Sequence, residues 1–136
     1  MKSRINFFLI VAMILMLIQI LLGISVREFV DNQIDIVGLE KKDIWLEKPK
    51  LNFYIHRTFS LLVFLSNAYL FILAKKSKIE MKFIKMINFL ILIEIIIGAC
   101  MYYFSFPILT QPIHLLISIL ILSLQFYWLL KLRKPY

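Results

Sequence analysis

The sequence predicts an all-α membrane protein in which four transmembrane helices form one bundle. Hydrophobic residues make up 62% of the 136 residues, and they gather in four runs long enough to cross a bilayer, which takes roughly 20 residues. Polar residues also recur at matched positions, which indicates two parallel copies of a helical hairpin. The connections are short, so we expect one integral membrane domain over residues 1–136. The expected spans are about 6–26, 53–74, 84–104 and 113–130.

The first expected span contains Gln19 and, four residues later, Gly23. A separation of four places both on one helical face, where glycine lets a neighbouring helix approach closely. A polar group in a span should face the bundle interior rather than lipid. The apolar part of this span is longer than the roughly 7–15 residues of a signal peptide, so we interpret it as a retained helix.

A long outer loop, about residues 27–52, follows the first span and has mixed charge. Parts of it are apolar, and we expect it either to lie on the membrane surface, with Trp45 as an interfacial anchor, or to cover the outer end of the bundle as a lid. Pro49 disfavours an unbroken helix through its second half.

The second and fourth spans repeat one polar pattern. Each opens with a histidine, has a serine four residues later and a carboxamide eleven residues later. At about 100° per residue, both steps return close to the starting face. Two such helices side by side would therefore direct two imidazoles at a shared space. The matched pairs are His56 and His114, Ser60 and Ser118, and Asn67 and Gln125.

The third span repeats the pattern of the first, with Glu94 followed four residues later by Gly98. A charged carboxylate deep in a membrane is costly, so we expect Glu94 to be protonated or hydrogen-bonded inside the bundle. Its partner would be Gln19, a polar group of the site or a second protomer. The single cysteine, Cys100, excludes an intramolecular disulfide and is expected to pack as a small apolar residue.

The net charge of +8 is a topology signal. Basic residues gather before the first span, in the inner loop 75–83 and after the fourth span, whereas loop 105–112 has no charge. The positive-inside rule then places both termini in the cytoplasm of a multi-pass cell-membrane protein. Attraction to anionic lipid is secondary, and we predict no nucleic-acid partner. The last basic group is Lys131, Arg133 and Lys134.

His56 and His114 lie at matched depth and are the only histidines in the chain. This arrangement suits axial ligation of one iron from opposite sides, because histidine is a standard haem ligand and bundle cores commonly hold cofactors. Zinc would need further protein ligands. The alternative interpretation is that both histidines are interfacial polar residues.

Other polar residues near the outer boundary are candidates for the same site. Arg27 and Arg57 can pair with carboxylates such as haem propionates; otherwise they extend to the interface as ordinary boundary arginines. Tyr102, Tyr103 and Gln111 either line the pocket or, for the tyrosines, belong to an aromatic belt.

These motifs, taken in order, resemble the haem A synthase family of cytochrome oxidase assembly proteins. The matching pieces are Gln19-x3-Gly23 followed by Arg27, His56-Arg57, Glu94-x3-Gly98 and Gln111-x2-His114. The resemblance implies a bundle that holds haem between two histidines, and an enzyme that oxidises a ring methyl of haem O to a formyl group. His56 and His114 would then be the iron ligands of a b-type haem, or of haem O or A, with Arg27, Arg57 and Gln111 beside them.

The sequence departs from the family pattern in three ways. Family members usually have two tandem bundles, so this chain would need a homodimer or a second haem protein. Phe53 stands where the substrate half of the family has glutamate, and loop 27–52 lacks the cysteine pair of many members. No catalytic residue is therefore assigned.

The sequence leaves three functions open. The first is a haem A synthase-like oxidoreductase that works as a dimer, with lipid and oxidase assembly factors as partners. The second is a b-type cytochrome or haem carrier without oxygenase activity. The third is a haem-free membrane assembly protein.

Overall fold

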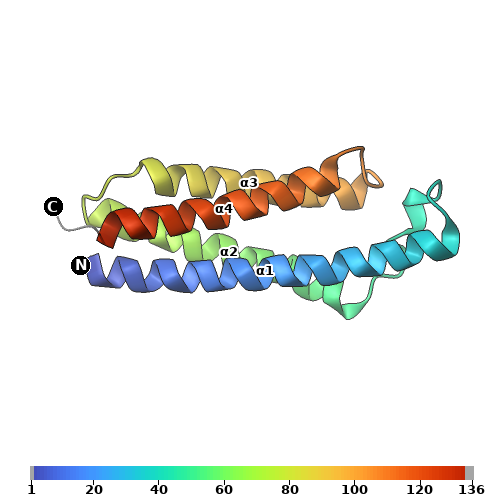
Figure 1. The fold of residues 1–136 in the computed structure, drawn as a ribbon, viewed down its shortest axis with the longest axis horizontal. Coiled ribbons are helices and arrows are strands. Elements are labelled where there is room, and N and C mark those ends of the chain that lie inside the picture. Colours follow the sequence, from blue (N-terminus) through green and yellow to red (C-terminus); the bar gives the residue numbers. More distant parts are fainter. Residues whose placement is uncertain (1, 134–136) are drawn as a thin grey trace.

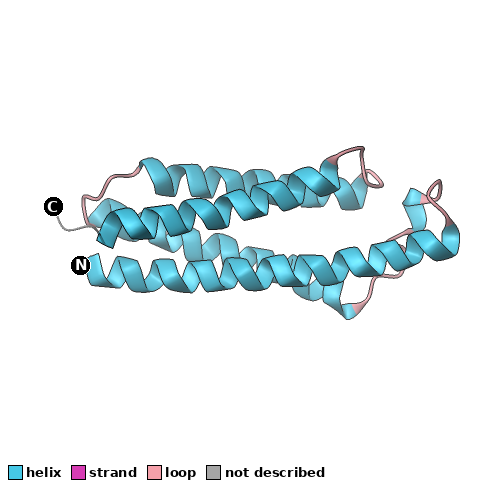
Figure 2. Ribbon diagram, viewed as in Figure 1, coloured by secondary structure: helices cyan, strands magenta, loops and turns pink. Residues whose placement is uncertain are grey.

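The computed structural model describes residues 2–133, and these form long helices joined by short connections. Within this part of the chain there is no strand (Figure 2). The predicted all-α fold with four helices of membrane-spanning length is therefore confirmed. Lys134 of the predicted basic flank lies outside the described residues. The elements are α1 (Lys2–Val37), the short 3-10 helix η1 (Lys42–Ile44), α2 (Leu51–Lys76), α3 (Lys82–Tyr103) and α4 (Thr110–Arg133).

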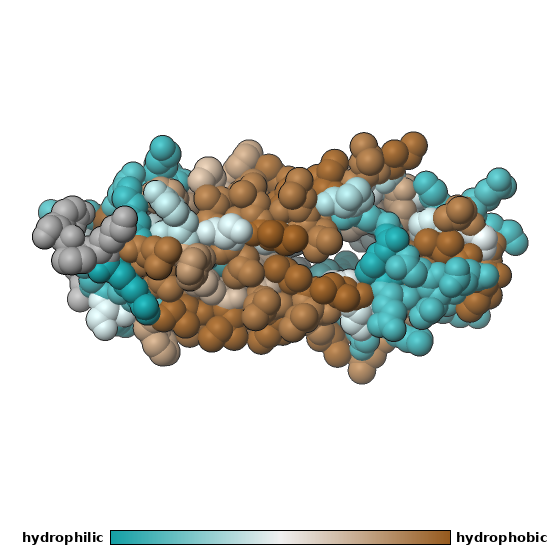
Figure 3. Space-filling model, viewed as in Figure 1, coloured by the Kyte–Doolittle hydropathy of each residue, from teal (hydrophilic) through white to brown (hydrophobic). Residues whose placement is uncertain are grey.

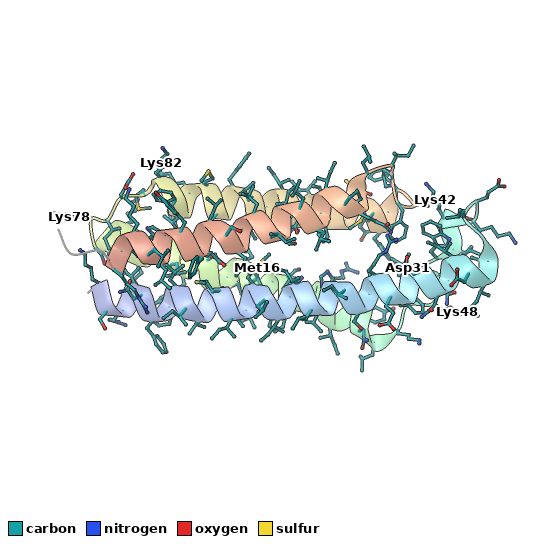
Figure 4. All side chains as sticks on the ribbon, in the orientation of Figure 1. Met16, Asp31, Lys42, Lys48, Lys78 and Lys82 are labelled. Carbon is teal, nitrogen blue, oxygen red and sulfur yellow. The ribbon has the colours of Figure 1, made fainter. Side chains whose placement is uncertain are left out.

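All four helices are long and apolar enough to cross a membrane. Figure 3 shows an apolar band on the viewed face, between two polar ends. Charged residues labelled in Figure 4 lie at those ends, with Lys78 and Lys82 near the termini and Asp31, Lys42 and Lys48 at the opposite, distal end. The protein is a multi-pass membrane protein. Large apolar side chains that are exposed along the four helices include Leu21, Leu65, Phe89, Leu116 and Phe126.

The helices form a bundle in which each hairpin packs against the other along both of its helices. α1 contacts α2 and α4, and α3 contacts α4 and α2, so α2 and α4 lie across a diagonal. The two hairpins run in the same direction (Figure 1). Lipid is as apolar as the core, so close packing and interhelical hydrogen bonds hold such a bundle together. The innermost side chains include Leu9, Met16, Leu70, Ile87, Ile121 and Trp128.

Helix α1 extends well past the predicted end of the first span. Because it continues to Val37, the connection predicted for residues 27–52 begins only at Gly38. Apolar residues at helical spacing, Val30, Ile34 and Val37, favour this extension. Gly38 ends the helix with a positive φ of 91°, and its N–H donates to the Ile34 carbonyl at 2.8 Å. α1 therefore stands out beyond the other helices at the distal end (Figure 1).

The predicted position of Trp45 as a membrane-surface anchor is wrong. Trp45 is only 4% exposed and forms a small cluster with Val30 and Phe106. Its ring centroid lies 5.3 Å from that of Phe106, and its indole N–H donates to the Gly38 carbonyl at 3.2 Å. The ring can bury itself because both its apolar face and its polar edge find partners. This cluster, here called the distal cap, joins α1, the first loop and the loop after α3.

A buried hydrogen bond connects the matched carboxamides across the bundle diagonal. Gln125 of α4 donates through Nε2 to Oδ1 of Asn67 in α2 at 3.0 Å, and both residues are fully buried. The Asn67 amide in turn donates to the Val63 carbonyl at 2.9 Å. Each group gains a partner that lipid cannot offer. The matched residues of the sequence repeat therefore meet in space.

Gln125→Leu should destabilise the bundle, because it removes the donor to Asn67 Oδ1 while keeping a similar volume. We expect a loss of about 1–2 kcal/mol in the free energy of unfolding, measured by denaturant titration in detergent micelles. Ser123→Ala is the control, since the Ser123 hydroxyl is exposed and bonds only within its own helix. Equal stability of the two variants would contradict this role.

Candidate functional site

The two histidines meet near the distal end of the bundle. His56 lies in the second turn of α2 and His114 in the second turn of α4. Their ring centroids are 6.5 Å apart, and the ring planes are inclined by 77°. Both residues are half-buried. The structure therefore brings the imidazoles together across the α2–α4 diagonal, on the same diagonal as Asn67 and Gln125.

Each imidazole lies against a glycine of its own hairpin. A Cβ atom added to Gly23 of α1 would lie 3.2 Å from Cε1 of His56, and one added to Gly98 of α3 would lie 3.4 Å from Cε1 of His114. Any larger residue at Gly23 would therefore press on the ring. The two helical hairpins thus form the same contact, which is the geometric reason for the Gly23 and Gly98 match in the sequence.

The polar residue one turn before each glycine has a different partner in the two hairpins. Gln19 donates through Nε2 to the backbone carbonyl of His56 at 3.2 Å. Glu94 accepts a hydrogen bond from the Ser118 hydroxyl through Oε1, and its Oε2 lies 3.0 Å from Nδ1 of His114. Among the alternatives predicted for Glu94, the structure therefore shows a contact with a polar group of the site.

An aromatic pair includes a residue one turn before His56 in α2. Phe53, one turn earlier in α2, stacks on Tyr102 of α3 with ring centroids 5.3 Å apart and planes inclined by 26°. The Arg57 guanidinium lies over the Tyr102 ring, 5.9 Å from its centroid. A stacked aromatic pair thus occupies the place where the resembling family has a carboxylate.

The remaining predicted site residues are less closely placed. Arg27 pairs with Asp31 on its own helix, with Nη2 and Oδ1 2.7 Å apart and both side chains about half exposed. Gln111 is half-buried and lies one turn before His114 in α4. The structure therefore brings His56 and His114 together and places Arg57 against Tyr102, whereas Arg27 has a local partner.

Sequence reasoning missed a polar contact beside the site. Asn52 at the start of α2 donates to the Ser25 hydroxyl of α1 at 2.6 Å. Both residues line a pocket of about 150 Å³ that also includes Lys50 and Phe53. Asn52 and Ser25 lie 27 positions apart in the sequence and show no matched spacing, so no sequence signal was available. Figure 3 shows the molecule hollowed where the apolar band meets the polar distal end.

Within residues 2–133, no three His, Cys, Asp or Glu side chains gather closely enough to hold a metal ion. The cluster is instead a pair of imidazoles, inclined by 77°, with one carboxylate beside His114. Two imidazoles whose centroids lie 6.5 Å apart could supply two nitrogen ligands. They suit a group that supplies its own equatorial ligands.

The family model described as cytochrome oxidase assembly protein, COX15-CtaA, matches residues 1–126. The chain belongs to the haem A synthase family. The match covers α1, α2, α3 and most of α4, and therefore includes both histidines and both glycines. Haem A synthase family membership gives the protein a role in cytochrome oxidase assembly and an association with haem. No curated protein and no solved structure matches the chain.

Gly23→Ala should disturb the site more than Gly98→Ala. The added methyl of the first variant meets the His56 ring at 3.2 Å, whereas that of the second makes an ordinary contact at 3.4 Å. We expect Gly23→Ala to lower the free energy of unfolding by roughly 1–3 kcal/mol. Gly98→Ala should change it by less than about 1 kcal/mol, because alanine also favours the helix. Thermal unfolding in detergent, followed by circular dichroism, compares the two; the reverse order would contradict the assigned contacts.

Proposed function

We propose that this protein binds one haem between His56 and His114 and works as a haem A synthase-like oxidoreductase in cytochrome oxidase assembly. The observation that carries the proposal is the separation of 6.5 Å between the imidazole centroids. An imidazole nitrogen binds a metal at about 2 Å, so two rings on opposite sides of one metal have centroids about 6 Å apart. The separation thus fits one iron between the rings.

The surroundings of the two rings support the same proposal. Gly23 and Gly98 have no side chain, so the His56 ring can pack closely on α1 and the His114 ring on α3. Nδ1 of His56 is buried and has no hydrogen-bond partner in the described structure, whereas Nδ1 of His114 lies 3.0 Å from Oε2 of Glu94. The carboxylate beside His114 would hold that ring in place for a ligand bound through its other nitrogen.

Haem, when bound, supplies an iron centre for electron transfer and oxidation. In the proposed site, His56 and His114 would hold the iron, the arginines would bind the haem carboxylates at the distal end, and Gln111 would line the pocket beside them. Arg57 follows His56 directly in α2 and contacts Tyr102, which supports its assignment to this site. Arg27 would exchange Asp31 for a propionate, which is feasible because that ion pair is half exposed and therefore weak. The haem would be b-type as a cofactor, or haem O and haem A as substrate and product.

A second function, a b-type cytochrome or haem carrier without oxygenase activity, is favoured by one specific observation. Phe53, at the family's glutamate position, stacks on Tyr102 and offers no carboxylate. Two protein ligands also leave the iron without an open position. The haem-free assembly protein is the third candidate, and it predicts that neither histidine matters for cofactor content.

We further propose that both termini are cytoplasmic and that the distal end faces the outer side of the cell membrane. Lysines gather at the terminal end, where Lys131 also pairs with Glu80 at 2.5 Å. A second copy of the chain, or another haem protein, would supply the second haem. Lipid and oxidase assembly factors complete the expected partners. The orientation can be checked with an impermeant thiol reagent on intact cells, which should label a cysteine introduced at Lys48 and not one at Lys78.

The decisive experiment is the optical spectrum of the detergent-purified protein, recorded oxidised and then reduced. We expect a low-spin, six-coordinate haem in the wild type, lost in both His56→Ala and His114→Ala because each variant lacks one axial ligand. Ser60→Ala is the control, since its hydroxyl bonds only to the Arg57 carbonyl within α2. A colourless wild type from haem-rich cells would instead support the haem-free assembly protein.

Extraction and identification of the haem separates the two haem-binding functions. A host that makes haem O should accumulate haem A when it expresses the wild type and should not when it expresses His56→Ala. A folded, haem-loaded dimer that leaves haem O unchanged would overturn the oxidoreductase and favour the carrier.

A further inference from the structure

The two halves of the proposed haem site differ at one matched position. Gln19 in α1 and Glu94 in α3 each lie one turn before the glycine that supports a histidine. Both are buried, with 9% and 8% of their surface exposed. One is a neutral amide and the other a carboxylic acid, so the two histidines have chemically unequal neighbours.

Glu94 is oriented toward the His114 ring. The Ser118 hydroxyl donates to Oε1, which leaves Oε2 directed at Nδ1 of His114 at 3.0 Å. Neither Oε2 nor Nδ1 has another hydrogen-bond partner in the part of the chain that is described. A proton on Nδ1 would satisfy both buried atoms at once, and it would leave the lone pair on Nε2 free for a metal.

His56 lacks this support. Its matched residue, Gln19, donates to the backbone carbonyl of His56 and not to the ring. Nδ1 of His56 is buried and has no partner among residues 2–133. A neutral amide is also a weaker acceptor than a carboxylate, because hydrogen bonds with a charged partner are roughly twice as strong.

We propose that Glu94 is a positioning residue that fixes the His114 ring through Nδ1 and makes His114 the stronger of two unequal haem ligands. This inference rests on the proposed haem site. A carboxylate behind a ligating imidazole fixes the tautomer and ring orientation and raises the basicity of the ligand. A more basic ligand favours oxidised iron, so Glu94 lowers the reduction potential of the bound haem. His56 is the ligand held less firmly.

Glu94→Gln tests this with the shape of the side chain preserved. We expect the reduction midpoint to move upward, the low-spin electron paramagnetic resonance signal to shift, and haem to dissociate about tenfold more readily. Gln19→Leu is the matched variant in the other hairpin, and its midpoint should move by less than half as much. A midpoint and resonance signal unchanged by Glu94→Gln, in a protein that still holds haem, would overturn the inference and leave the haem site intact.

A second measurement, the binding of free imidazoles to histidine-to-glycine variants, leaves Glu94 unchanged. It therefore does not require that a Glu94 variant folds. His114→Gly and His56→Gly each open a cavity that free imidazole can fill, and 1-methylimidazole lacks the N–H that Nδ1 would donate. We expect the His114→Gly protein to bind imidazole about tenfold more tightly than 1-methylimidazole, as one charge-assisted hydrogen bond would give. The His56→Gly protein should show little preference, because Nδ1 of His56 has no hydrogen-bond partner among residues 2–133.

The outcomes of the two measurements are distinguishable. Equal preferences of the two cavity variants would overturn the inference, even where Glu94→Gln does not fold. A wild type that binds no haem at all would overturn the proposed function and this inference together. A wild type that binds haem, together with a preference for imidazole over 1-methylimidazole in His114→Gly alone, supports both the proposed function and this inference.

Discussion

The arrangement of this bundle depends on the need to satisfy polar groups where no water is present. Within the hydrocarbon layer a polar side chain must find its partner inside the protein. Gln19, Asn67, Glu94 and Gln125 each find at least one partner on another helix or on the backbone. Each such bond fixes the rotation of a helix about its own axis. Apolar packing alone would leave that rotation poorly defined, because lipid and core are chemically alike.

The same constraint explains what the sequence could predict. The stripe from His56 to Asn67 identified the inward face of α2, since polar residues at helical spacing have only one low-cost orientation. The Gly23 and Gly98 match identified the close hairpin contacts for a similar reason. The four spans could be predicted from hydropathy. Most observed helices extend a few residues beyond the predicted ends, and α1 extends eleven residues beyond its predicted C-terminal end.

Other features depended on contacts between residues far apart in the chain. The burial of Trp45 requires Phe106, which lies 61 residues later, and nothing in the composition of either loop indicates the pairing. The Phe53 stack on Tyr102 and the contact of Glu94 with His114 are also tertiary. Glu94 had several plausible partners in the sequence, and only the helix rotations selected one. The two hairpins thus share the histidines and glycines that bring the imidazoles together. They differ at Gln19 and Glu94, which give the two rings different neighbours.

Helix α1 has a mechanical consequence at the distal end. Gly23, behind the His56 ring, and Val30, in the distal cap, lie on one uninterrupted helix that stops only at Gly38. The seven residues between Gly23 and Val30 rise about 10 Å along the helix axis, so one helix sets the height of the distal cap above the His56 ring. A tilt of α1 would therefore displace both contacts together.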